Sequence, residues 1–336
     1  MAVTARSVIE SCEAAKDASL DLARASTAVK DAALDAAARL LEERLATILE
    51  ANAADLADER AVGLSSALRD RLTLTDARVR EMAAGVRQIA ALPDPVGEEL
   101  DRRTLSSGLD LRKVRVPLGV VAVVYEARPN VTVDCAALTI KSGNAIVLRG
   151  SSYAERSNGA LAAVMRDALA EAGLPEDAVV LLAGGGREDL GIMATQDGLV
   201  DLLIPRGGEG LKAALKDVAT VPVMYAAAGN CHVYVHDDAE LGMARRIAYN
   251  AKVQRPGVCN AAETLLVHES VAEEFLPGAL ADLHGAGVEL VGDEPARAAA
   301  DGVAVGPAAE ADWDTEYLDM KMVVGVVGSL EEAVEH

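Results

Sequence analysis

From residue 118 to residue 225 the chain alternates short, almost wholly apolar runs with longer amphipathic segments. A strand that is apolar along its whole length has to be covered on both faces, and an amphipathic helix after each strand provides that cover. The expected strands are 119–125, 145–148, 178–183, 199–204 and 221–225, and the expected helices between them are 131–141, 157–172, 187–194 and 210–218. The alternation predicts an α/β fold with a doubly wound, Rossmann-like parallel sheet.

Two segments before this unit have different patterns. The first ninety residues carry an apolar stripe at helical spacing, made by Leu34, Ala37, Leu41, Leu45 and Ile48. This stripe predicts amphipathic helices that serve as scaffold. Residues 100–116 instead alternate in the manner of strands, around a turn signal at Ser106, Ser107 and Gly108. They predict a protruding β-hairpin.

Composition narrows the class of protein. The 336 residues include 53 acidic and 32 basic side chains, for a formal net charge of −21. Such a charge argues against nucleic acid or an anionic membrane as a partner. No apolar stretch approaches a membrane span and the N-terminus lacks a signal sequence, so a cytoplasmic enzyme is expected. The histidines show no metal-ligand spacing, and no metal site is expected.

One cysteine lies in a position suited to chemistry. Cys259 follows a Pro-Gly turn between an Ala-rich helical segment and the strand-like residues 263–268. A turn between regular elements can hold a thiol at a cleft, where it can act as a nucleophile. A small buried hydrophobic residue is the other interpretation of a free cysteine.

The loops after the expected strands carry glycine and arginine. They are residues 125–130, 149–152, 184–187 and 205–208; three contain glycine and all four contain arginine. Glycine lets backbone N–H groups approach a phosphate, and arginine supplies paired donors. The candidate cofactor-binding residues from these loops are Arg149, Gly185, Arg206, Gly207 and Gly208. The alternative is that these glycines only allow the chain to turn from strand to helix. This alternative stays open, since the usual G-x-G-x-x-G spacing is missing.

Five stretches carry a specific resemblance. They are residues 124–134, 141–145, 204–208, 229–235 and 254–264. In these stretches the chain resembles the gamma-glutamyl phosphate reductase family of the aldehyde dehydrogenase superfamily. The resemblance implies an aldehyde dehydrogenase-like fold: a cofactor domain at 1–228, a catalytic domain at 229–336 and a hairpin arm for oligomerisation at about 98–117.

The resemblance also implies roles for single residues. Cys259 takes the place of the family's nucleophile, and Asn130 that of an asparagine that helps form the oxyanion hole. Arg149, Ser151 and Ser152 fall where the superfamily binds the adenosine ribose. Gly207 and Gly208 fall where its phosphate-binding helix begins, and Glu316 where a glutamate holds the nicotinamide ribose. Each of these residues also has an ordinary structural interpretation as a loop or cap residue.

The expected reaction is the NADPH-dependent reduction of L-glutamyl 5-phosphate to glutamate 5-semialdehyde, in proline biosynthesis. A thiolate that attacks an acyl phosphate expels phosphate and forms a thioester, which hydride converts to the aldehyde. Residues 224–229 contain no carboxylate where hydrolytic relatives place their general base, which favours reduction over hydrolysis. A hydrolytic or CoA-forming dehydrogenase and a catalytically silent paralogue remain as alternatives.

Further expectations concern ligands and partners. Arg128 and Arg255 are candidates for the anionic ends of the substrate, because an acidic protein must concentrate positive charge where it binds an anion. A structural ion pair is the alternative for each. Arg149 with two serines would accept the 2′-phosphate of NADP(H). The resemblance suggests a homo-oligomer and functional coupling to glutamate 5-kinase.

The end of the chain gives a last expectation. Ser329 and Glu332 have the spacing of a capping box at a helix start, and the sequence stops at His336. A newly capped helix normally continues and returns to a strand. The sequence is therefore expected to be an incomplete polypeptide with little activity as it stands.

Overall fold

The computed structural model describes residues 6–61, 63–64, 66–182, 186–207, 209–225 and 229–336. The chain divides into two compact units, Met1–Ala226 and Ala227–His336. Each unit has its own sheet and its own apolar core. Across the described residues, no helix is both long and apolar enough to cross a membrane.

The sheet of the first unit has four parallel strands in the order β5-β4-β3-β6. The strands are β3 (Val120–Tyr125), β4 (Ala145–Arg149), β5 (Val179–Leu181) and β6 (Leu202–Arg206). Every residue of β3 is buried, as expected of a central strand that is covered on both faces. The predicted doubly wound α/β fold is confirmed.

Helices cover both faces of this sheet. The helices of the unit are α1 (Val8–Arg24), α2 (Thr27–Glu43), α3 (Leu45–Leu56), α4 (Ser66–Leu72), α5 (Asp76–Ala91), α6 (Asn130–Lys141), α7 (Glu155–Glu171), α8 (Arg187–Ala194) and α9 (Glu209–Lys216). Helices α6 and α7 pack on one face and α1 and α8 on the other, while α2 and α5 form a further layer outside α6. Leu34, Ala37 and Leu41 of the predicted N-terminal stripe are fully buried. That stripe is confirmed as core.

Two of the predicted strands differ from the structure. Residues 196–200 form a turn in which Gly198 has φ 83°, so β6 begins at Leu202 rather than at residue 199. The predicted strand 221–225 makes only one bridge, between Val223 and Leu203. The N–H of Leu203 bonds to Pro222, and the next outward-facing position of β6 is Pro205, which has no N–H. The ladder therefore stops after one bridge, and this prediction was wrong.

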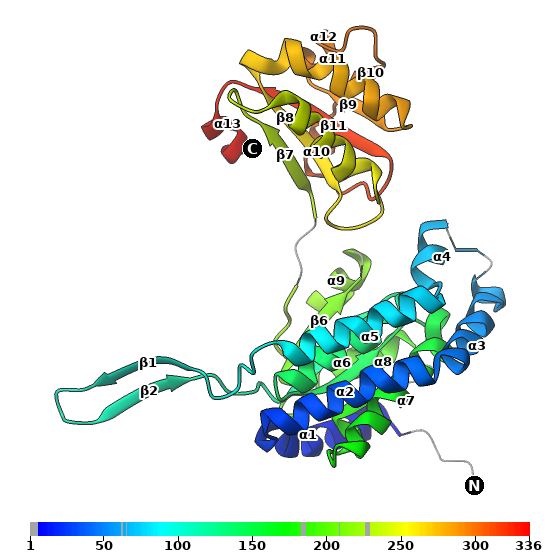
Figure 1. Ribbon diagram of the computed structural model, residues 1–336, viewed down its shortest axis with the longest axis vertical. Helices are drawn as coiled ribbons and strands as arrows, with labels where there is room; N and C mark the ends of the chain where they lie inside the picture. The colour runs from blue at the N-terminus through cyan, green and yellow to red at the C-terminus, as the bar shows by residue number, and fades with distance from the viewer. Residues whose placement is uncertain (1–5, 62, 65, 183–185, 208, 226–228) are drawn as a thin grey trace. The chain divides into compact units, whose positions relative to one another are not determined.

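The predicted hairpin is present. Strands β1 (Glu99–Thr104) and β2 (Asp110–Val114) form an antiparallel pair apart from the central sheet (Figure 1). Gly108 closes the turn with φ 84°, a backbone conformation that favours glycine. Every residue of both strands is exposed, including Leu100, Leu111 and Val114.

The sheet of the second unit has five parallel strands in the order β10-β9-β11-β8-β7. The strands are β7 (Cys231–Val235), β8 (Ala262–His268), β9 (Glu289–Gly292), β10 (Val305–Pro307) and β11 (Lys321–Val327), and the helices are α10 (Leu241–Val253), α11 (Glu269–Gly285), α12 (Glu294–Ala298) and α13 (Leu330–Glu335). Ser329 caps α13, as its sequence predicts. The 3₁₀ turn Glu310–Asp314 places the Trp313 ring against Gly325 of β11, where a Cβ would clash with it.

Candidate active site

Cys259 lies in the turn that joins α10 to β8. Two tight turns follow one another there: the N–H of Val258 bonds to Arg255 O at 3.4 Å, and the N–H of Ala261 bonds to Val258 O at 3.0 Å. Cys259 is a corner residue of the second turn, and its side chain is exposed. Exposure excludes the interpretation of Cys259 as a small buried core residue and leaves its thiol accessible to a substrate.

The backbone of the turn lies against the start of β7. A Cβ added to Gly229 would overlap the carbonyl oxygen of Cys259, so only glycine allows this close approach. The same Cβ would lie 2.8 Å from Oε1 of Glu316. Glu316 is thus brought near the Cys259 turn within the second unit, although the two residues are distant in sequence.

A second thiol lies beside the turn. Sγ of Cys231 donates to the carbonyl oxygen of Cys259 at 3.3 Å. Burial raises the pKa of Cys231, and the nearby Cys259, Glu263 and Glu316 raise it further. Burial also raises the pKa of Cys12 and of Cys135 to about 11. These three thiols are therefore held in the protonated, weakly nucleophilic form at neutral pH.

Side chains at the start of β8 fix the surroundings of the turn. Oδ1 of Asn230 accepts from the Thr264 hydroxyl at 3.0 Å, and its Nδ2 donates to Trp313 O at 2.5 Å. Glu263 is fully buried and pairs with the buried Lys252 at 2.6 Å. Sequence reasoning missed these contacts, although Asn230 and Glu263 lie in stretches that carry the family resemblance.

The cofactor candidates of the first unit gather at the carboxyl edge of its sheet. The chain changes direction between the neighbouring strands β3 and β6, which makes this edge a topological switch point, the usual ligand site of such folds. Val124 of β3 pairs with Arg149 of β4, and Tyr125 pairs with Arg206 of β6. The two arginines therefore end the strands on either side of β3. Arg149 donates to Gly186 O at 2.8 Å.

The described loops at this edge have tightly packed backbones. A Cβ on Gly207 would lie 2.9 Å from Oε1 of Glu126, and one on Gly150 would overlap the Asn158 amide. Ser151 begins a 3₁₀ turn and accepts the N–H of Tyr153 at 3.3 Å, whereas Ser152 is exposed. Close packing therefore requires glycine at positions 150 and 207. Gly185 and Gly208 lie outside the described residues.

The remaining candidates divide between the units. Asn130 is the first residue of α6, is exposed, and donates to Oδ2 of Asp134 at 3.0 Å. Burial raises the pKa of Asp134, and the bond from Asn130 and the charge of Arg206 oppose that rise. Arg128 is half-buried in the loop before α6. Arg255 is exposed and opens the double turn that carries Cys259.

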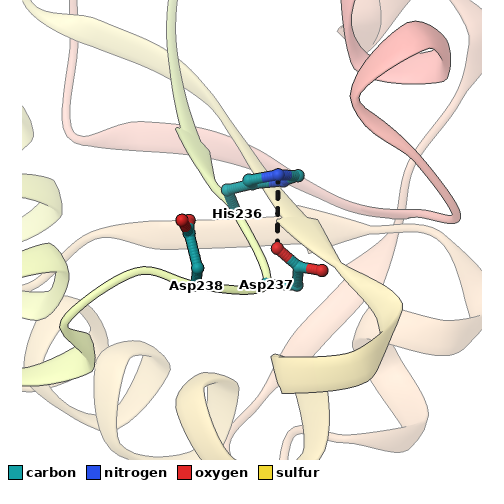
Figure 2. A group of neighbouring side chains, drawn as sticks. All are labelled: His236, Asp237 and Asp238. Carbon is teal, nitrogen blue, oxygen red and sulfur yellow. Dashed lines mark ion pairs between the residues drawn. The ribbon is translucent and has the colours of Figure 1, made fainter.

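One group of possible metal ligands occurs among the described residues. His236, Asp237 and Asp238 follow β7 and bring their donor atoms within 4.8 Å of one another (Figure 2). Nδ1 of His236 already contacts the Tyr234 hydroxyl at 2.9 Å, and its Nε2 lies 3.2 Å from Asp237. Both ring nitrogens are engaged and both carboxylates are exposed, so the group has the character of a surface polar cluster.

The sequence of the chain was compared with those of known proteins, and the comparison shows its family. The sequence matches the aldehyde dehydrogenase family over residues 1–314. It is 51% identical over 331 residues to the gamma-glutamyl phosphate reductase of Thermobifida fusca, covering 98% of this chain and 79% of that protein. Against the enzyme of the same name from Moorella thermoacetica the identity is 52% over 322 residues, with 96% and 77% covered.

A solved structure agrees with these sequence matches. The crystal structure of gamma-glutamyl phosphate reductase from Thermotoga maritima superposes with a TM-score of 0.91 at 42% identity. The match covers 98% of this chain and 80% of that one. The fold predicted from the resemblance is therefore confirmed.

Proposed function

Because the chain belongs to the aldehyde dehydrogenase family and is about half identical to enzymes named gamma-glutamyl phosphate reductase, we propose that it reduces L-glutamyl 5-phosphate to glutamate 5-semialdehyde. The observation that carries the proposal is the exposed Cys259 thiol on a fixed double turn. The activity belongs to proline biosynthesis, and the enzyme is an oxidoreductase.

The covalent step of the proposed reaction takes place on Cys259 of the second unit. The Cys259 thiolate attacks the acyl carbon, the bond to the phosphate oxygen breaks, and phosphate leaves with its electron pair. The product of this step is a thioester on Cys259. Addition of hydride to the thioester carbon gives a thiohemiacetal, which collapses to the aldehyde and regenerates the thiol. Asn130 is proposed to stabilise the oxyanion, and Arg128 and Arg255 to bind the anionic ends of the substrate.

The chain's residues suit a nicotinamide dinucleotide, which supplies the hydride when it is bound. Arg149 and Arg206 end the strands on either side of β3. Gly207, which follows Arg206, has no side chain, so its backbone at this edge of the sheet stays uncovered by a Cβ. We assign the adenosine ribose to Arg149, Ser151 and Ser152. The phosphates are assigned to Arg206 and to Gly185, Gly207 and Gly208, and the nicotinamide ribose to Glu316.

Arg149 is expected to determine a preference for NADP(H) over NAD(H). Its guanidinium can pair with a 2′-phosphate, and residues 149–152 provide no carboxylate to bind a free 2′-OH. Arg149→Ala should lower kcat/KM with NADPH by about 10- to 100-fold and leave kcat/KM with NADH within about threefold, since a charge-assisted bond contributes about 1.5–3 kcal/mol. Steady-state kinetics with both cofactors measures this. An unchanged NADPH preference in the variant would remove the assignment.

The test of the function is the reverse reaction of the full-length enzyme, followed as NADP⁺ reduction with glutamate semialdehyde. Turnover should require inorganic phosphate, because phosphate is the acceptor that releases the acyl group from Cys259. A hydrolytic dehydrogenase would turn over without phosphate, and a CoA-forming one would need CoA instead. A silent paralogue would show no turnover with any acceptor.

The exposed hairpin is proposed to make an oligomer contact. Its apolar residues Leu100, Leu109, Leu111 and Val114 are all at least partly open to solvent, and such a surface is typical of an interaction site. A cytoplasmic location and functional coupling to glutamate 5-kinase remain part of the proposal. The location is the expectation drawn from the sequence pattern, and the coupling is drawn from the family resemblance.

A further inference from the structure

We propose that Glu263 is a positioning residue that locks the turn carrying Cys259 to the segment carrying Glu316. The inference rests on the proposed function for its catalytic meaning, while its structural part stands on contacts within the second unit. Glu263 is the second residue of β8, four positions after Cys259, and its side chain is fully buried.

The two carboxylate oxygens of Glu263 reach two different parts of the unit. Oε2 pairs with Nζ of Lys252 at 2.6 Å, and Lys252 lies in the last turn of α10. Lys252 and Glu263 therefore stand at the two ends of the loop that contains Cys259. Oε1 accepts the backbone N–H of Leu318 at 3.1 Å, two residues beyond Glu316. One rigid, buried group thus touches both catalytic segments.

Leu318 has an unusual backbone conformation. Its φ is 54°, in the left-handed region that residues other than glycine and asparagine seldom occupy. A residue keeps such a conformation only when its surroundings hold it there, and positions of this kind cluster at functional sites. Glu263 provides a buried, charged acceptor for the N–H of this strained residue, and so helps to maintain the local path of the chain after Glu316.

The neighbouring residue fixes the other side of the same segment. The hydroxyl of Thr264 bonds to Asn230, and the amide of Asn230 donates to Trp313 O. Residues 313 and 318 are therefore both tied to the start of β8, and Glu316 lies between the two ties. Because β8 follows the Cys259 turn directly, a shift of the turn would displace Glu316. A shift of Glu316 would likewise displace the turn.

The first unit contains a matched ion pair without this connection. Nζ of Lys30 lies 2.6 Å from Oδ2 of Asp94, and Oδ1 of Asp94 accepts the N–H of Val96 at 3.0 Å. The side chain of Lys30 is 1% exposed and that of Asp94 10%. This pair has the same chemistry, nearly the same burial and a bond to a backbone N–H, here a local one, and Asp94 also accepts the Thr27 hydroxyl at 2.7 Å. It is therefore the control for a purely structural effect.

The experiment compares three variants of the full-length enzyme. Lys252→Met/Glu263→Met replaces the whole pair with apolar groups, a change that buried ion pairs often tolerate, and leaves Leu318 without its acceptor. Lys252→Met/Glu263→Gln also removes both charges but keeps an amide oxygen for Leu318. Lys30→Met/Asp94→Leu is the control. Each is measured for thermal unfolding, for kcat and KM, and for acrylamide quenching of Trp313, the single tryptophan of the chain.

The Met/Met variant should fold and lose about 10- to 100-fold in kcat, because small displacements of reacting groups have effects of that size. Its Trp313 should become more accessible to acrylamide. The Met/Gln variant should recover most of kcat, and the control should stay within about twofold of the wild type in kcat and unchanged in quenching. A folded Met/Met variant with wild-type kcat and quenching would overturn the proposal.

If the Met/Met variant fails to fold, the variant Glu263→Asp tests the positioning role of Glu263 instead. The shorter side chain keeps its charge but cannot reach both Lys252 and Leu318, so kcat should fall and quenching should rise. Unchanged values in folded Glu263→Asp would overturn the proposal. Quenching needs no turnover. Wild-type enzyme without phosphate-dependent activity would therefore refute the proposed function, while the quenching comparison would still test the role of Glu263.

Discussion

Cys259→Ala should lower phosphate-dependent turnover by roughly 10⁴-fold or more, as expected when a covalent nucleophile is removed. Alanine has no group that can form the thioester, so no later step can proceed. The candidate cofactor residues of the first unit are untouched by the change. The Kd for NADPH, measured by the fluorescence of the nicotinamide ring, should therefore stay within about threefold of the wild-type value.

The other three cysteines are the controls for this result. Cys12→Ser, Cys135→Ser and Cys231→Ser should each keep activity, because burial raises the pKa of all three thiols and the mechanism uses none of them. The serine hydroxyl at position 231 can still donate to Cys259 O. Acyl-phosphate reduction by Cys259→Ala at a rate near that of the wild type would falsify the covalent mechanism.

Gly229→Ala should have the second largest effect. Its new Cβ would overlap the carbonyl oxygen of Cys259 and press on the Glu316 carboxylate. A backbone carbonyl in a double turn cannot yield as a flexible side chain can, so the turn must move. We expect a loss of about 1–3 kcal/mol in the free energy of unfolding and a fall in kcat of about 10²-fold. Denaturant unfolding and steady-state kinetics measure the two effects.

Gly285→Ala is the matched control in the same unit. Gly285 ends α11, and no atom lies within 4 Å of a Cβ placed on it. Alanine at this helical position should stabilise the protein by about 0.5–1 kcal/mol and leave kcat unchanged. If Gly229→Ala behaved like Gly285→Ala, the close approach between Gly229 and the Cys259 turn would have no functional importance.

Local pattern was sufficient to predict most of the first unit. Fully apolar runs such as 120–124 are typical of central strands, and the stripe through Leu34 and Leu41 is typical of the buried face of a helix. The run 221–225 is similarly apolar, yet it makes a single bridge. Its own Pro222 is a local sign against a full strand, whereas Pro205, which ends the ladder, lies in another strand and could not be anticipated from the run itself.

In the candidate site, too, some features could be predicted from local sequence and others could not. The Pro-Gly turn indicated an accessible Cys259 but left a buried thiol as the alternative, and the placement of Arg149 and Arg206 follows from strand order. The contacts of Glu263 and Asn230 were not predictable. Asn230 meets the carbonyl of a residue 83 positions away, and Glu263 meets the N–H of one 55 positions away. Such pairs have no local signature, because folding alone brings their partners together.

Pro205 has a further consequence for the behaviour of the folded protein. Strand β6 is the last full strand on its side of the sheet, and an open strand edge is a template on which another chain can add. Of the outward-facing positions of β6, Leu203 already gives its N–H to Pro222, and Pro205 has none to give. Within β6 (Leu202–Arg206), a foreign strand therefore finds no unused outward-facing backbone donor. The proline that ends the ladder thus also makes β6 a poor template for strand addition.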